Sequence, residues 1–336
     1  MVWLDNSRVI AIFAVVFLHV ATGVVIGSDI GTKSWWIGNL YDSLVRWCVP
    51  VFVMISGALL LDPSKKEDLR TFYLKRLSRI SIPILFWSAL FLLWATLKGT
   101  IKGEPLSLVD LATRLLSGKP YFHMWFLYMI ITLYLFTPFF RRLLKGSSRN
   151  EIAVLVLFTF VLSALNALAG NLFLGDSKLF INWFLSYIPY FFLGYLVRTR
   201  ERDYPSRILW GVFVVSVILT AAGCYAVGRT EGLDAGLYFY GYLSITVIPM
   251  SVSVMHLLKS WTKPIGSVGL TKQIAALTLG VYLIHPIFLE VIQYAGYCSL
   301  AFYPGVSIPV ITFVVCGLSL SGAWVINKVP YLKRVI

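Results

Sequence analysis

The chain has 336 residues, of which 58% are hydrophobic, 15% aromatic and only 13% charged. Soluble domains carry about 25% charged residues, and here apolar windows of about 20 residues, long enough to span a bilayer, recur along the whole length. This composition excludes a large soluble enzyme and predicts an all-α polytopic membrane protein. The formal charge of +14 lies mainly in short loops between apolar segments, which indicates membrane topology and no nucleic-acid partner.

Hydropathy predicts about ten transmembrane helices in a single membrane domain, residues 1–336. The first apolar segment lacks a basic leader and a small-residue cleavage site, so we interpret it as a retained helix. The largest loop, 98–120, is expected to form a short surface helix across Leu106 to Leu116. The expected spans are 6–26, 40–61, 77–97, 121–141, 150–170, 181–197, 206–227, 237–257, 275–295 and 306–327.

The distribution of lysine and arginine predicts that both termini lie in the cytoplasm. With this orientation the inner loops carry twenty of these residues and the outer loops seven, among them Lys98, Lys102, Arg114 and Lys119. No internal repeat and no pair of similarly broken apolar segments is evident, and many secondary transporters have such features. The four cysteines are scattered, which predicts neither a disulfide framework nor a metal site.

The first span contains two ionisable residues, Arg8 and His19, at a depth where such groups are rare. Eleven residues make about three helical turns, so both side chains lie on nearly one face, roughly 16 Å apart along the axis. Asp5 shares this face and is expected to pair with Arg8. For Arg8 a contact with lipid headgroups is equally compatible, whereas the depth of His19 favours a function.

A basic run opens the third span, with Lys75, Arg76 and Arg79 close together. Two arginines at i and i+3 beside a lysine can surround a phosphate with charge-assisted hydrogen bonds. Taken alone, the run is also typical of the positively charged inner side. Arg79 already lies inside the apolar segment, where topology requires no charge.

Asp42 and Arg46 in the second span have i, i+4 spacing, which predicts an ion pair. A structural pair and a substrate contact are both compatible with this spacing. Further along the same span, Ser56-Gly57 favours close helix packing over exposure of the backbone to a ligand.

Two further histidines lie in apolar surroundings. His123 and Trp125 open the fourth span, where an interfacial aromatic belt explains the tryptophan and a sugar-binding shelf would explain both. In the ninth span Tyr282 and His285 point the same way, and Pro286 is expected to kink the helix and free backbone carbonyls.

Together these residues resemble membrane acyltransferase family 3, which is found in bacterial surface-glycan O-acetyltransferases. The chain is similar to stand-alone members, including one linked to acetylation of enterobacterial common antigen, and no fused soluble domain is expected. Lys75 stands where the family often has arginine. The matching pieces, in the family's order, are Trp3 to Arg8 followed by His19, the Pro50 to Gly57 run, the Lys75 to Arg79 run, His123-x-Trp125 and Tyr282-x-x-His285.

The resemblance implies an enzyme of the bacterial inner membrane that moves an acetyl group from cytoplasmic acetyl-CoA to a hydroxyl of a glycan or lipid-linked sugar. It implies no permanently bound cofactor and no metal. His19 would act as general base, although an acyl-histidine intermediate is also compatible. Arg8 or Tyr282 would stabilise the oxyanion.

The resemblance also distributes the remaining residues between the two substrates. The nucleotide phosphates would be held by Lys75, Arg76, Arg79 and Arg8. The acceptor would be bound, or its site supported, by Arg46, His123, Trp125, Tyr282 and His285.

Two other function classes stay open at this point. Buried histidines and arginines also mark transport routes, so a transporter or flippase of a small solute or lipid-linked sugar is compatible. The absent repeat and the phosphate-binding run at one mouth count against it. A non-catalytic scaffold for polysaccharide assembly would tolerate replacement of His19. Acetyl and succinyl donors are both compatible, and the sequence predicts no oligomeric state.

Overall fold

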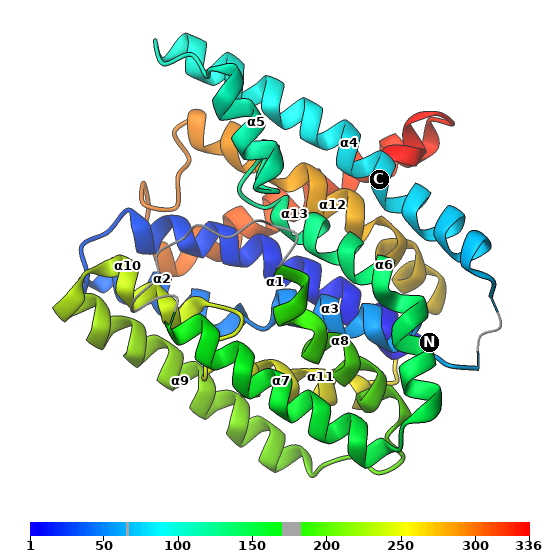
Figure 1. Ribbon diagram of the computed structural model, residues 1–336. Helices are drawn as coiled ribbons and strands as arrows, with labels where there is room; N and C mark the ends of the chain where they lie inside the picture. The colour runs from blue at the N-terminus through cyan, green and yellow to red at the C-terminus, as the bar shows by residue number, and fades with distance from the viewer. Residues whose placement is uncertain (65–66, 170–182) are drawn as a thin grey trace.

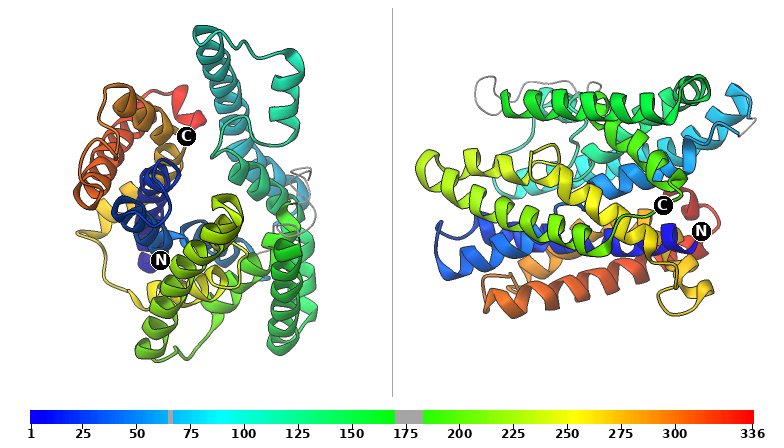
Figure 2. Two further views of the ribbon diagram at one scale, coloured as in Figure 1. Left: turned by 90° about the vertical axis from the view of Figure 1, so that its left-hand side faces the viewer. Right: turned by 90° about the horizontal axis from the view of Figure 1, so that it is seen from below.

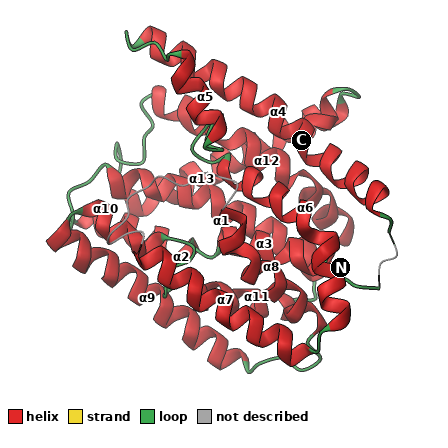
Figure 3. Cartoon of the chain, viewed as in Figure 1, coloured by secondary structure: helices red, strands yellow, loops and turns green. Residues whose placement is uncertain are grey.

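The computed structural model describes residues 1–64, 67–169 and 183–336, and within these ranges it contains helices and no strand (Figures 1 and 3). Seven helical segments of this part are long and apolar enough to cross a membrane. They are α1 (Val2–Ile26), Lys33–Leu60, α4 (Leu69–Ile101), α6 (Trp125–Gly146), α9 (Ser206–Glu231), α12 (Val268–Tyr294) and α13 (Pro304–Lys328). The all-α polytopic membrane fold is therefore confirmed.

Three further helices occupy the other expected spans. They are α7 (Arg149–Ala169), α8 (Trp183–Thr199) and α11 (Val247–Ser260). Ten spans thus stay a prediction, since these three are shorter or less completely described than the other seven. The count of charges behind the predicted orientation includes Lys65, Lys66 and Lys178, and these three residues lie outside the described part of the chain. The same is true of the edges of two expected spans, at 170 and 181–182.

Helix α1 lies at the centre of the bundle. It contacts α2 (Lys33–Val45), α3 (Cys48–Leu60), α11, α12 and α13. Most of its side chains from Ala11 to Val25 are buried, because a helix that is apolar on all sides must be covered on all sides. His19 is carried on this central helix, so neighbouring helices surround it.

Two spans that the sequence predicts as continuous are interrupted. The segment 40–61 breaks between α2 and α3, and in 237–257 only α11 is a regular α-helix, after α10 (Leu233–Gly236) and the 3-10 helix η3 (Leu237–Tyr240). The expectation of no paired broken segments was therefore wrong. Each interruption ends at a helix whose third residue is proline, Pro50 or Pro249. Proline suits a first turn because the missing N–H has no helical partner there.

A short amphipathic helix, α5 (Leu108–Leu116), follows α4 and confirms the expected surface helix. Ser107 caps it: the Ser107 hydroxyl and N–H donate to the Asp110 carboxylate, and they hold the pKa of that carboxyl below its usual value. None of the α5 side chains is buried. Its apolar face is thus not covered by the rest of the described chain.

Both termini lie at the same end of the bundle, where α4 also begins (Figures 1 and 2). The C-terminal 3-10 helix η4 (Leu332–Val335) packs against α4, and the Trp87 indole N–H donates to the Val335 carbonyl at 2.8 Å. The shared end agrees with an even number of spans. The side of the membrane on which this end lies stays a prediction.

Candidate active site

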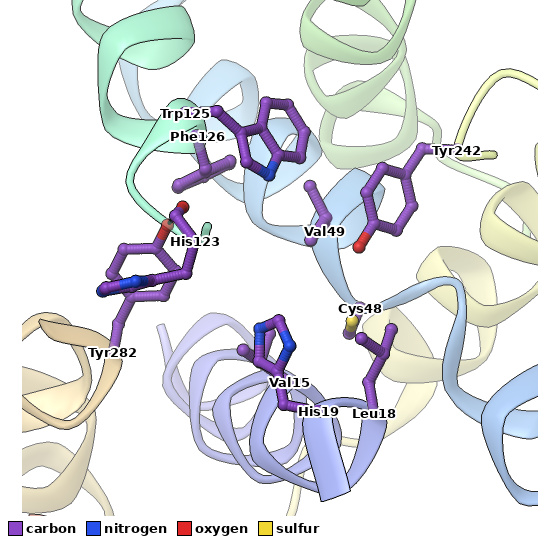
Figure 4. Close-up of a pocket in the computed structure, with 10 residues that line it drawn as sticks. All are labelled: Val15, Leu18, His19, Cys48, Val49, His123, Trp125, Phe126, Tyr242 and Tyr282. Atoms are coloured by element: carbon purple, nitrogen blue, oxygen red, sulfur yellow. Dashed lines mark hydrogen bonds between the residues drawn. The ribbon is translucent and has the colours of Figure 1, made fainter. Parts of the chain in front are cut away.

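His19 projects from α1 into a small pocket (Figure 4). Its imidazole stacks on that of His285 with ring centroids 5.2 Å apart, and it meets the ring of Phe122 edge-on at 5.0 Å. No ion pair to His19 occurs among the described residues. The histidine is therefore held by ring contacts, and its nitrogens are available to a ligand.

His285 is fixed by the proline that follows it. Pro286 has no N–H, so the carbonyl of Tyr282, four residues earlier, loses its helical partner. The Nδ1 atom of His285 lies 2.7 Å from that carbonyl oxygen, and because a carbonyl only accepts, Nδ1 carries the proton. The buried Nε2 atom has no hydrogen-bond partner in the described part of the chain and is left as an acceptor.

His123 lies just before α6 and is only 2% exposed. Its ring is 5.5 Å from that of His285 and 5.1 Å from that of Tyr282. The Tyr282 hydroxyl donates to the His123 carbonyl and so ties α12 to the start of α6. Among the described residues no hydrogen bond of normal geometry engages either ring nitrogen of His123, although the backbone of Leu283 lies near the ring.

Trp125 and Tyr242 form the opposite wall, stacked at 5.8 Å. Figure 4 shows His19 facing them across the pocket, with His123 and Tyr282 to one side. The pocket has a volume of about 20 Å³, which is room for about one water molecule and far below the usual range of ligand sites. It is lined by Val15, Leu18, His19, Cys48, Val49, His123, Trp125, Phe126, Tyr242 and Tyr282.

Both interrupted spans contribute to this pocket. Cys48 and Val49 begin α3 directly after the first interruption, and Tyr242 lies within the second. Irregular backbone at membrane depth is tolerated where it is enclosed by protein or lines a cavity. The sequence analysis did not identify Tyr242 or Cys48. Pro50 and Pro249, near the starts of α3 and α11, are the sequence signal that could have located the two interruptions.

A buried ion pair joins the two interruptions. The Arg46 Nε atom lies 2.5 Å from the Asp42 carboxylate, which confirms the predicted pair. The Arg46 guanidinium also lies 4.0 Å from the centre of the Tyr240 ring and donates to the Tyr240 carbonyl at 3.4 Å. The Thr22 hydroxyl donates to Asp42 at 2.6 Å. Arg46 is thus a structural link beside the pocket and does not line it.

The expected Asp5–Arg8 pair is present at the other end of α1, with 3.4 Å between Nη1 of Arg8 and the carboxylate. The Arg8 side chain is 32% exposed and lies within electrostatic range of Arg79 on α4 and Tyr134 on α6. Arg8 and the basic run therefore share one end of the molecule. His19 lies about three helical turns away along α1.

The basic run is partly neutralised by Glu67. Its carboxylate lies 3.8 Å from Nζ of Lys75 and 3.7 Å from Nη1 of Arg141. Arg79 is exposed, and Arg76 is half-buried, with an Nε atom that has no hydrogen-bond partner in the described ranges. Arg76 and Arg79 are consequently better placed to bind an anion than Lys75 is.

The structure thus separates the predicted residues into three groups. One group surrounds the pocket, one supports it through the ion pair, and one lies at the end that bears the termini. The residues form no cluster suited to a metal ion within the described part of the chain. The group around the pocket is His19, His123, Trp125, Tyr282 and His285. The supporting residue is Arg46. The group at the end with the termini is Asp5, Arg8, Lys75, Arg76 and Arg79.

The family model Acyl_transf_3, described as an acyltransferase domain, matches residues 1–328. No curated protein matches the chain, and no solved structure matches it.

Proposed function

Since the chain belongs to the Acyl_transf_3 family of acyltransferase domains, we propose that it transfers an acetyl group from cytoplasmic acetyl-CoA to a hydroxyl of a glycan or lipid-linked sugar in the bacterial inner membrane. The observation that supports this best is His19. Its imidazole can take up a proton, and it lies in a pocket to which two interrupted spans contribute. Helix α1 connects it to the end of the molecule where Arg8 and the basic run lie. Histidine is the side chain that most often acts as a general acid or base in enzymes.

In the proposed reaction His19 removes the proton of the acceptor hydroxyl as its oxygen attacks the thioester carbonyl. The carbon–sulfur bond breaks, and the CoA thiolate takes the proton from the imidazolium. An ester and free CoA are formed, and His19 is neutral again. The ring of His285, which stacks on His19, holds the imidazole in place for both proton transfers.

The oxyanion of this reaction needs a nearby donor. The sequence made Tyr282 a candidate for this donor, but its hydroxyl already donates to the His123 carbonyl, so it is less suitable for the role. Arg8 lies about three turns from His19. We assign the role to the ring of His123, which borders the pocket and has no hydrogen bond of normal geometry among the described residues.

For the donor, Arg76 and Arg79 would bind the CoA phosphates, with Arg8 nearby. Lys75 contributes less, because Glu67 neutralises it in part. The pantetheine arm would then extend along α1 from Arg8 toward His19. This arrangement requires no permanently bound cofactor.

The competing class is a transporter or flippase. The two interruptions are an argument for this class that the sequence did not provide, since transporters often bind their substrates at such breaks. Family membership supports the acyltransferase, and consumption of acetyl-CoA by the purified protein separates the two classes.

The first test replaces His19 by alanine. We expect His19→Ala to insert into the membrane normally and to lower acetyl-CoA consumption by about 100- to 10,000-fold, because the general base is lost. Release of free thiol by reconstituted protein measures this. The matched control is His256→Gln, whose ring packs on Tyr204 outside the pocket. Unchanged activity in His19→Ala would refute the catalytic role.

The second test concerns the donor. The double variant Arg76→Gln/Arg79→Gln should raise the KM for acetyl-CoA by about tenfold, equivalent to about 1.4 kcal/mol, because exposed charge-assisted contacts are weaker than buried ones. Arg142→Gln, an exposed cation of the same end on α6, is the control. If both variants keep the KM of the wild type, the basic run serves topology alone.

A further inference from the structure

A second cavity lies where the surface helix α5 leads into α6. It is an open hollow of about 490 Å³ and is therefore large enough for a sugar residue with its substituents. Most of its lining surface is apolar, and basic, hydroxyl and aromatic side chains all contribute to it. It is lined by Thr113, Arg114, Ser117, Lys119, Tyr121 and Phe122.

This cavity adjoins the pocket that contains His19. The ring of Phe122 lies 5.0 Å from the ring of His19 and 5.0 Å from that of Tyr121, measured between centroids. Phe122 is 50% exposed, so little covers it on the cavity side. A molecule in the cavity is thus separated from His19 by the ring of Phe122.

The cavity is positively charged. Arg114 and Lys119 line it, and Lys98 donates to the Tyr121 hydroxyl at 3.0 Å while it pairs with Glu290 at 2.8 Å. Asp110, one helical turn before Arg114, accepts hydrogen bonds from Ser107 and also interacts electrostatically with Arg114, so it offsets part of that charge.

Membrane topology does not explain these cations. The cavity lies beside the second half of α4, where Phe91 and Lys98 contact Tyr121, and away from the Lys75 to Arg79 run at the beginning of that helix. Positive charges gather on one side of a membrane protein and are depleted on the other. In the predicted orientation these cations lie on the depleted side, and cations there that also line a cavity indicate an anionic ligand.

We propose that this cavity receives the acceptor, and that the acceptor is an anionic sugar chain with a carboxylate or phosphate close to the hydroxyl that is acylated. Arg114 and Lys119 bind the negative group, since guanidinium and ammonium groups form charge-assisted bonds with both kinds of anion. The rings of Tyr121 and Phe122 bind the apolar face of the sugar. This inference rests on the proposed function and names the substrate class.

Binding of sugars to the full-length protein tests this without any transfer reaction. The protein is placed in nanodiscs of phosphatidylcholine and titrated with a hyaluronan tetrasaccharide, which carries carboxylates, and with the neutral chitotetraose. We expect the anionic sugar to bind at least about tenfold more tightly, or about 1.4 kcal/mol. We also expect the difference to shrink as salt is added, because partly exposed charges are screened.

Variants identify the cavity as the site of this preference. Arg114→Gln/Lys119→Gln should abolish it, while Lys102→Gln, an exposed cation of the same loop outside the cavity, should preserve it. Replacing a third of the lipid by phosphatidylglycerol should leave the preference intact. Loss of the preference with this lipid would assign the cations to a lipid headgroup and overturn the proposal.

Equal affinity for the two sugars would also overturn it, as would no binding of either at about 10 mM, where even weak sites with free energies of a few kcal/mol are occupied. A preference that survives the double substitution would place the anion elsewhere. The readout does not depend on acetyl-CoA. Failure of the proposed function, seen as no thiol release, is therefore distinguishable from failure of this inference.

Discussion

At the scale of single residues, the hydrogen bond of His285 determines which of its ring nitrogens carries the proton. The carbonyl freed by Pro286 was predictable, but its acceptance of the His285 proton required the structure. This bond leaves one nitrogen of His285 as an acceptor beside His19. The proline thus defines the tautomer of a histidine in the pocket wall.

The buried Asp42–Arg46 pair leads to a residue-scale prediction. Arg46→Met should lower the free energy of unfolding by about 3–5 kcal/mol, because it leaves Asp42 buried without its partner. The double variant Asp42→Leu/Arg46→Met should recover most of this loss, since an apolar pair needs no compensation. Thermal unfolding of the detergent-purified protein measures both. Equal midpoints for the single and the double variant would contradict the coupling.

At the scale of helices, α3 and α8 approach each other closely in the core. A Cβ atom at Gly57 would overlap the carbonyl oxygen of Phe191, and one at Gly194 would overlap that of Met54. Glycine at both places lets the two backbones touch. The expectation that Ser56-Gly57 serves packing is confirmed at Gly57.

Gly57→Ala should therefore destabilise the protein by about 1–3 kcal/mol, the usual loss for overpacking a core, because the obstacle is backbone and not a flexible side chain. Gly211→Ala on α9, where nothing lies within 4 Å of the new Cβ, should be neutral or slightly stabilising. The midpoint of thermal unfolding distinguishes the two. A neutral Gly57→Ala would mean that α3 and α8 can separate freely.

At the scale of the whole molecule, the two termini and the start of α4 share one end (Figure 2), and the cavity at α5 and α6 lies beside the second half of α4. The proposed donor and acceptor thus approach His19 from opposite ends of the bundle. A membrane enzyme that uses a cytoplasmic donor and an acceptor from the other side requires this arrangement.

Orientation is tested by cysteine labelling in intact cells on a Cys298→Ser background. We expect a membrane-impermeant maleimide to label Lys102→Cys, at the far end of α4, and to spare Lys333→Cys near the C-terminus, since positive charge favours the inner side. Both positions should be labelled after lysis. Labelling of Lys333→Cys alone in intact cells would reverse the orientation and the proposed route of acetyl-CoA.

The sequence by itself determined what depends on local spacing. The apolar windows, the surface helix at α5, and the pairs Asp5–Arg8 and Asp42–Arg46 all follow from hydropathy and helical geometry, which act over a few residues. Arg8 and His19 belong to one helix, so their common face was predictable as well.

Only the tertiary structure brought His123 and His285 to His19, because those contacts join segments more than a hundred residues apart and depend on which helix faces pack together. The structure also shows two interrupted spans that hydropathy had predicted as continuous. Hydropathy missed them because a window average depends on composition and does not register the missing N–H of Pro50 or Pro249. Those breaks form the walls of the pocket. The local pattern thus placed each ionisable group on a helix, and packing decided which of them meet.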